Sequence, residues 1–205
     1  MADAGLRERK KQATRVALGR AAWQLTIERG YDDVRVEDIA AAAGVSVRTF
    51  SNYFASKGQA LLSVGEDRGQ RIVAALRARP PAEDLWEALA AATAEQFTGD
   101  GEVPRDYASS VAYPAELASA QRRLSVSIEA ALAVAIAERT GTDPERDLYP
   151  RLVSAVAVSA TQAAFDYWRQ ADDGRGAEAP VAEPFASFLR RVLRQVAEGL
   201  PEPPA

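Results

Sequence analysis

Apolar side chains recur every three or four residues along nearly the whole chain of 205 residues. This spacing is that of an amphipathic α-helix, whereas a half-buried strand alternates every second residue. Alanine, leucine, arginine and glutamate, which favour helices, are abundant, and no segment has a convincing strand pattern. The sequence therefore predicts an all-α protein of about nine helices.

Capping and helix-breaking residues divide this pattern into segments. Ser46 and Ser56 are expected to cap the helices that follow them, Ser56 together with Gln59 in a capping box. Asp143 before Pro144 predicts another helix start, with the proline at the first helical position. The predicted helices cover residues 6–29, 36–43, 47–54, 56–79, 82–97, 105–111, 114–139, 144–170 and 180–198.

The prolines at 80 and 81 end the helix predicted at 56–79, and the helical pattern starts again after them. We count the helix 56–79 as a linker that belongs to the second domain. The predicted domains are therefore 1–55, with three helices, and 56–205, a larger helical domain. Residues 1–60 carry ten Lys/Arg and seven Asp/Glu, a charge of +3, whereas residues 61–205 carry fifteen and twenty-two, a charge of -7. A basic N-terminal part followed by an acidic remainder is expected if only the N-terminal part binds a polyanion.

The composition excludes several kinds of chemistry. Without histidine or cysteine the chain has no imidazole base, no thiol nucleophile, no Cys/His zinc site and no disulfide. No apolar run follows the basic residues near the start as a signal peptide requires, and the longest apolar run, 130–137, is too short to cross a bilayer. We expect a cytoplasmic protein with no membrane contact, no catalytic residue, no cofactor and no metal.

Residues 31–62 have the segment lengths of a helix-turn-helix, whose second helix enters the DNA major groove. Helical spacing lets five apolar residues pack beneath it, namely Ile39, Ala40, Val45, Phe50 and Phe54. The predicted DNA-binding residues face outward and are Arg35, Val47, Arg48, Thr49, Ser51, Asn52, Tyr53 and Lys57. Arginine suits guanine or phosphate and asparagine suits adenine, while tyrosine and lysine suit the backbone. Asn52 as a solvated helix residue and Tyr53 as a simple surface aromatic remain alternatives. The basic residues at 7–11 form either an arm along DNA or a disordered end.

This window resembles the TetR family of bacterial transcriptional regulators. The matching stretches are Glu28-Arg29-Gly30-Tyr31-Asp32, Val36-Glu37-Asp38-Ile39-Ala40, Gly44-Val45-Ser46, Phe50-Ser51-Asn52-Tyr53-Phe54, Ser56-Lys57 and Leu61-Leu62. The resemblance implies three N-terminal helices that bind operator DNA, a fourth linking helix, a homodimer built mainly from the last two helices, and repression relieved by a small molecule. Two positions depart from the family: Arg35 replaces the usual Thr or Ser cap, and Thr26 replaces a frequent Phe, so Trp23 or Ile27 is expected to fill that core.

The last helix carries one wide apolar face, and the helix before it is apolar on several sides. The predicted dimer interface contains Val156, Phe165, Phe185, Phe188, Leu189, Val192 and Val196. From the residues alone these faces can equally pack on each other within one chain. The family resemblance favours the dimer.

Aromatic and aliphatic residues of the second domain are candidates for an effector pocket, although most such residues in a protein are ordinary core. The predicted ligand-binding residues are Trp86, Phe97, Tyr107, Tyr113, Leu124, Phe165 and Trp168. Residues 114–139 and 147–151 resemble, weakly, regulators related to the mycofactocin-system regulator, a resemblance that implies an acyl-coenzyme A type ligand.

We therefore predict a sequence-specific transcriptional regulator, a homodimeric repressor released from double-stranded operator DNA by a small hydrophobic or acyl-CoA-like effector. One alternative is an all-α enzyme with metal-binding aspartates, but the pairs at 32–33 and 172–173 lack an acidic partner one turn later. Another is an architectural, non-specific DNA binder, which the acidic character of the whole chain disfavours.

Overall fold

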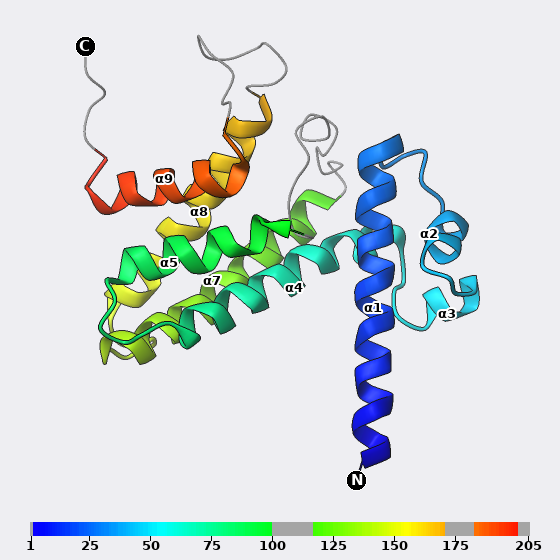
Figure 1. The fold of residues 1–205 in the computed structure, drawn as a ribbon, viewed down its shortest axis with the longest axis horizontal. Coiled ribbons are helices and arrows are strands. Elements are labelled where there is room, and N and C mark those ends of the chain that lie inside the picture. The colour runs from blue at the N-terminus through cyan, green and yellow to red at the C-terminus, as the bar shows by residue number, and fades with distance from the viewer. Residues whose placement is uncertain (1, 100–116, 171–182, 201–205) are drawn as a thin grey trace. The chain divides into compact units, whose positions relative to one another are not determined.

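A computed structural model describes residues 2–99, 117–170 and 183–200, and within these ranges the chain is helical without any strand (Figure 1). The all-α prediction is confirmed. The α-helices are α1 (Ala2–Arg29), α2 (Val36–Ala42), α3 (Val47–Ser51), α4 (Lys57–Ala78), α5 (Leu85–Ala94), α7 (Ala118–Thr140), α8 (Leu148–Gln170) and α9 (Phe185–Ala197), with a short 3-10 helix η1 (Glu95–Phe97). The helix predicted at 105–111 lies outside the described residues.

The predicted helix ends agree with the structure to within three residues, but α1 starts four residues earlier than predicted, α7 and α8 start four residues later, and α9 starts five residues later. Asp143 caps only a single turn, in which its carboxylate accepts hydrogen bonds from the backbone N–H groups of Glu145 (2.8 Å) and Arg146 (3.3 Å). Helix α8 begins four residues later than predicted, at Leu148. Helix α1 begins at Ala2 and not at residue 6, and the basic stretch at 7–11 is helical.

The described residues form two compact units, which we treat separately. The first unit contains residues 2–67 and 117–124, and the second contains residues 68–99, 125–170 and 183–200. Both α4 and α7 contribute residues to each unit. The domain boundary predicted after residue 55 stays a prediction.

The core of the first unit joins α1 to α2 and α3. Leu18, Ala22 and Leu25 of α1 are buried against the predicted core of the helix-turn-helix, in which Ile39, Ala40, Phe50 and Phe54 are buried and Val45 packs at the edge. The predicted packing of that motif is confirmed. Ile27 is buried as expected beside Thr26, whose hydroxyl donates to the carbonyl of Ala22 at 2.7 Å and so satisfies its polar atom in the core.

The core of the second unit has two parts. One is aliphatic and joins α4, α5, α7 and α8 through residues such as Leu76, Leu89, Ile136 and Val153. The other is aromatic and packs α9 against α5 and α8. The close approach of α4 and α7 in this unit requires glycine at 69, because a Cβ there would lie 2.6 Å from Cγ1 of Ile128.

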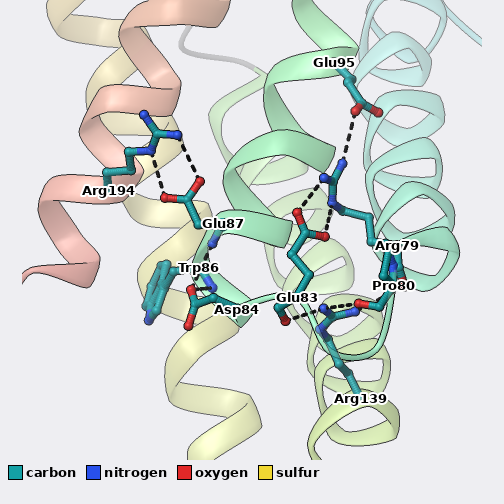
Figure 2. A network of polar contacts seen from close by, with 9 residues as sticks. All are labelled: Arg79, Pro80, Glu83, Asp84, Trp86, Glu87, Glu95, Arg139 and Arg194. Atoms are coloured by element: carbon teal, nitrogen blue, oxygen red, sulfur yellow. Dashed lines mark hydrogen bonds and ion pairs between the residues drawn. The ribbon is translucent and has the colours of Figure 1, made fainter.

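Arginines hold the connection between α4 and α5 in the second unit (Figure 2). Arg79 donates to both carboxylate oxygens of Glu83 at 2.6 Å, and Arg139 donates to the carbonyls of Pro80 and Glu83, also at 2.6 Å. The hydrogen bonds from Arg79 lower the pKa of Glu83 below its ordinary value. Asp84 then caps α5 by accepting from the backbone N–H of Trp86 at 2.9 Å.

Candidate nucleic-acid interface and effector domain

The turn between α2 and α3 has the backbone geometry of a helix-turn-helix. Gly44 lies in the left-handed region at φ +68°, where a side chain would be strained. The N–H of Val45 then donates back to the carbonyl of Ala40 at 2.9 Å. Ser46 caps α3 as predicted, because its hydroxyl accepts from the N–H of Thr49 at 3.1 Å. Residues of the turn itself therefore set the direction in which α3 begins.

The predicted DNA-binding residues on and after α3 share one accessible surface. Val47, Arg48, Ser51 and Asn52 are exposed, and Thr49 and Tyr53 are half-buried. Helix α3 ends at Ser51, three residues earlier than predicted, because Asn52 and Tyr53 donate their N–H groups to carbonyls three residues back. Both side chains therefore lie on the tight turn that ends the helix.

Arg35 stands at the start of α2 and is exposed, as a phosphate contact requires. Its side chain makes no cap hydrogen bond, because a guanidinium has only donors and the helix start also offers donors. The carboxylate of Asp38 accepts from the N–H of Arg35 at 3.1 Å instead. The departure from the family pattern at Arg35 thus leaves α2 with one of its two usual cap contacts.

Lys57 is the predicted DNA-binding residue whose environment differs most from the expectation. Its ammonium donates to the backbone carbonyls of Tyr31 (2.7 Å), Val34 (3.0 Å) and Asp32 (3.3 Å) within the same chain. Ser56, the residue before it, caps α4 by accepting from the N–H of Gln59 at 3.2 Å. In the predicted capping box the side chain of Gln59 would accept from the N–H of Ser56. In the structure it accepts from the N–H of Ala55, one residue earlier in the chain.

Arg15 makes contacts within the first unit that sequence analysis did not predict. From α1 its guanidinium donates to Asp67 at 2.8 Å and to Glu66 at 2.5 Å, and it lies 5.6 Å from the ring centre of Phe54. The Asp67 side chain is only 10% exposed, so this ion pair is largely shielded from water. These partners are more than fifty residues apart in sequence, and no local pattern links them.

Four of the predicted ligand-binding residues come together in the aromatic cluster of the second unit, which we define by Phe97, Phe165, Trp168, Phe185 and Phe188 with Trp86 at its edge. Phe185 is its centre, with ring centres 4.8 Å from Phe97 and 5.4 Å from both Phe165 and Trp168. Leu124 is not in this cluster: it packs on Gly65 in the first unit. Tyr107 and Tyr113 lie outside the described residues.

The predicted dimer residues divide into two groups. Phe185, Phe188 and Leu189 are buried within their own chain, in the aromatic cluster and the core around it, whereas Val156, Phe165, Val192 and Val196 are half-buried. The large apolar side chains that face solvent on α8 are different ones: Leu148 is 73% exposed, Leu152 is 53%, Tyr149 is 48% and Tyr167 is 47% exposed.

The residues that the structure describes contain no cluster of three or more acidic side chains suited to a metal ion. In the same part of the chain, every helix is too short or too polar to span a membrane.

Comparisons with known proteins match both parts of the chain. Residues 19–64 match the family model "Bacterial regulatory proteins, tetR family", and residues 79–201 match "MftR C-terminal domain". The HTH-type transcriptional regulator TcmR of Streptomyces glaucescens is 37% identical over 162 residues, which are 74% of this chain and 71% of that protein.

Solved structures share the fold. The fatty acid degradation regulator FadR of Bacillus halodurans is 20% identical, with a TM-score of 0.62, and the match covers 93% of this chain and 97% of that one. FadR of Thermus thermophilus, a TetR-family transcriptional repressor solved in complex with lauroyl-CoA, is 24% identical with the same coverage and a TM-score of 0.54. The predicted helix-turn-helix fold is confirmed.

Proposed function

Since the chain belongs to the TetR family of transcriptional regulators, we propose that it is a repressor that binds an operator through α3 and releases it when a small effector binds the second unit. The polar surface of α3 carries the proposal. Its side chains are accessible, while the buried residues beneath it, Phe50 above all, hold the helix in place. The proposed function is therefore DNA binding.

In this proposal the residues on and around α3 divide between contacts to bases and contacts to the DNA backbone. Arg48 has the fork of donors that fits guanine, and the amide of Asn52 fits the edge of adenine. The hydroxyl of Ser51 donates to the carbonyl of Val47 at 3.1 Å and keeps its lone pairs as acceptors. Arg35 and Tyr53 contact phosphates, which place the motif without reading sequence.

We also propose that the protein binds DNA as a homodimer, because two half-sites in one operator need two copies of α3. The surface of α8 supports this proposal. Leu148 and Leu152 are one turn apart, and the half-buried Val156 continues the same stripe one turn further on. A second copy of the stripe would cover these apolar side chains around a two-fold axis.

The proposed effector is a hydrophobic acyl compound such as an acyl-CoA. T. thermophilus FadR was solved with lauroyl-CoA, and the aromatic cluster of this chain offers an apolar environment for an acyl chain. Trp86 and Phe165 are half-buried at the edge of that cluster and are the residues we place nearest the ligand. Binding there would favour a conformation of α4 in which two copies of α3 no longer fit the operator.

Fluorescence anisotropy on the DNA upstream of the protein's own gene tests this function, with a random duplex as competitor. We expect preference for the upstream DNA, and Asn52→Ala should weaken specific binding by about tenfold to a hundredfold while leaving random-duplex binding nearly unchanged. Gln195→Ala, which removes an exposed amide from α9, is the matched control and should bind as wild type. Equal losses on both duplexes would remove Asn52 as a base contact, and no preference by the wild type for any operator would overturn the repressor.

The effector is tested in the same assay with lauroyl-CoA, free coenzyme A and laurate as separate additions. Release by lauroyl-CoA alone supports the acyl-CoA class, and release by laurate as well reduces the requirement to the acyl chain. Operator binding that none of the three changes would discard the effector class and leave the operator function intact.

A further inference from the structure

The ammonium of Lys57 is held inside the first unit by a seat of backbone carbonyls. An ammonium has three protons, and the three carbonyls of residues 31, 32 and 34 lie 2.7 to 3.3 Å from Nζ. The ring of Tyr31 lies beneath the same charge, with its centre 4.2 Å from Nζ. Every donor of the side chain therefore has an acceptor within the chain itself. We call these acceptors, the three carbonyls and the Tyr31 ring, the lysine seat.

The lysine seat occupies the turn that leads from α1 into the helix-turn-helix. Gly30 ends α1 at φ +82°, and four residues later the side chain of Val34 is buried in the core, next to the start of α2 at Val36. Because α2 packs on both α1 and α3, a change in this turn would move α2, and α3 with it. Lys57 thus connects the first residue of α4 to the placement of the recognition helix.

Close packing keeps the seat in place. Gly58 follows Lys57, and a Cβ at that position would lie 2.6 Å from Leu117 and 3.0 Å from the hydroxyl of Tyr31. No residue larger than glycine fits without displacing one of these neighbours. The start of α4 is therefore pressed against the residue whose carbonyl and ring both hold the ammonium.

Electrostatics explains why negative partial charges surround this ammonium. A cation at the first turn of a helix faces the positive end of the helix dipole, which is unfavourable unless negative groups lie nearby. The three carbonyl oxygens and the ring face supply that negative partial charge. A DNA phosphate could bind this ammonium only by taking it from acceptors that it already has.

We propose that Lys57 serves operator binding as a positioning residue, which fixes the turn before α2 and through it the placement of α3, and that it does not contact a phosphate. This inference rests on the operator binding proposed above. The inference predicts how operator affinity depends on salt concentration. A lysine that pairs with a phosphate releases counterions, whereas a lysine that binds only its own chain leaves the number of released counterions unchanged.

The test is the salt dependence of operator affinity for wild type, Lys57→Gln and Arg35→Gln. We expect Lys57→Gln to weaken operator binding roughly tenfold, as when one base contact is impaired, with less loss on a random duplex. Its slope of log affinity against log salt should equal that of wild type. Arg35→Gln removes an exposed cation, which the proposed function places on a phosphate, and should reduce the slope by about 0.9 per protomer, or about 1.8 for a dimer.

Each other outcome is decisive. A slope reduced in Lys57→Gln as much as in Arg35→Gln would make Lys57 a phosphate contact and overturn the inference. A fall in the fraction of active protein by stoichiometric titration, with wild-type affinity in the remainder, would mean that Lys57 only stabilises the fold. A wild-type protein without operator preference would overturn the proposed function itself, which this design separates from a failure at Lys57.

Hydrogen exchange in the free protein tests the lysine seat without DNA. The N–H of Val34 donates to the carbonyl of Tyr31 at 3.3 Å, within the seat. In Lys57→Gln this amide should exchange faster, while amides of α9 in the second unit should exchange as in wild type. Unchanged exchange at Val34 would show that Lys57 does not hold the turn, and the inference would fail on that result alone.

Discussion

The two units use their large side chains differently. In the first unit the predicted site residues of α3 are accessible and the apolar residues of the same motif lie beneath them. In the second unit Phe97 and Trp168, predicted to bind the effector, are themselves buried core. The difference has a physical cause. A polar side chain on a helix that already has a buried face must point to solvent, whereas an aromatic side chain satisfies a core and a pocket wall equally well.

One ion pair in each unit shows how exposure changes the strength of such a contact. Arg15 and Asp67 of the first unit are 26% and 10% exposed, so their attraction is poorly screened. In the second unit the paired side chains of Arg77 and Glu138 are 47% and 52% exposed, and water and salt screen them. We therefore expect loss of the Arg15 pair to lower stability more than loss of the Arg77 pair.

The largest effect is expected for Phe50→Ala. Phe50 is 2% exposed at the centre of the first core, and its loss should lower the free energy of unfolding by about 3–5 kcal/mol, because a buried ring leaves a cavity. Denaturant unfolding and operator anisotropy would measure the change, and operator binding should disappear. Val47→Ala, on the exposed face of α3, is the control for unfolding alone, because Val47 is itself a predicted DNA-binding residue. A stable Phe50→Ala protein would show that this core is not what holds α3.

Leu152→Asp tests the apolar stripe of α8. Leu152 is 53% exposed in the single chain, so the change should leave the monomer folded but place a charge in the proposed dimer interface. Analytical ultracentrifugation should show a shift from dimer to monomer, with circular dichroism unchanged. Ser127→Asp, an exposed residue of α7, is the control. A Leu152→Asp protein that remains dimeric would place the interface elsewhere.

Arg15→Met leaves the carboxylate of Asp67 without its nearest cation. We expect a loss of about 1–3 kcal/mol in stability, since a poorly solvated charge then lacks its hydrogen bond. Thermal unfolding measures this loss. Arg77→Met breaks an exposed pair of similar geometry in the second unit and should melt close to wild type. Equal losses in the two variants would contradict the view that the shielded Arg15 pair stabilises the fold more than the exposed Arg77 pair.

Ser46→Ala removes the cap of α3 and should cost about 1 kcal/mol. Ser56→Ala removes the matching contact at α4 and should cost a similar amount. The two variants differ in what they disturb, because α3 has only five residues and α4 has 22. Operator affinity, measured beside thermal stability, should fall more for Ser46→Ala. Equal affinities would mean that the turn and the core orient α3 without the cap.

The smallest effect is expected for Glu83→Gln, and it depends on pH. Hydrogen bonds from Arg79 lower the pKa of Glu83 in the folded chain, so the ionised carboxylate favours folding above its ordinary pKa of about 4.5, and this contribution is lost as pH falls through the lowered value. The melting temperature of Glu83→Gln should be slightly below that of wild type at pH 7. The two should converge in acid, and a difference that grows in acid would contradict the assignment.

Much of the first unit could be predicted because its signals are local. The cap at Ser46, the glycine at 44 and the alternation of buried and exposed residues in the helix-turn-helix all act within a few residues. The start of α8 was mispredicted for a related reason. Asp143 and Pro144 carry the local signal of a helix start, but Asp147 closes the turn on itself by accepting from the N–H of Asp143 at 2.8 Å.

The helical class, the helix-turn-helix and its exposed residues follow from the amino-acid sequence, because helical spacing, caps and turns depend on neighbours along the chain. Which cations bind groups of their own chain became known from the folded structure. Lys57 meets carbonyls 23 to 26 residues away, and Arg15 meets carboxylates 51 and 52 residues away. The sequence around a charged side chain does not indicate which group that side chain binds. Lys57 is therefore predicted from the sequence to contact a phosphate, whereas in the folded chain it donates to carbonyls of its own chain.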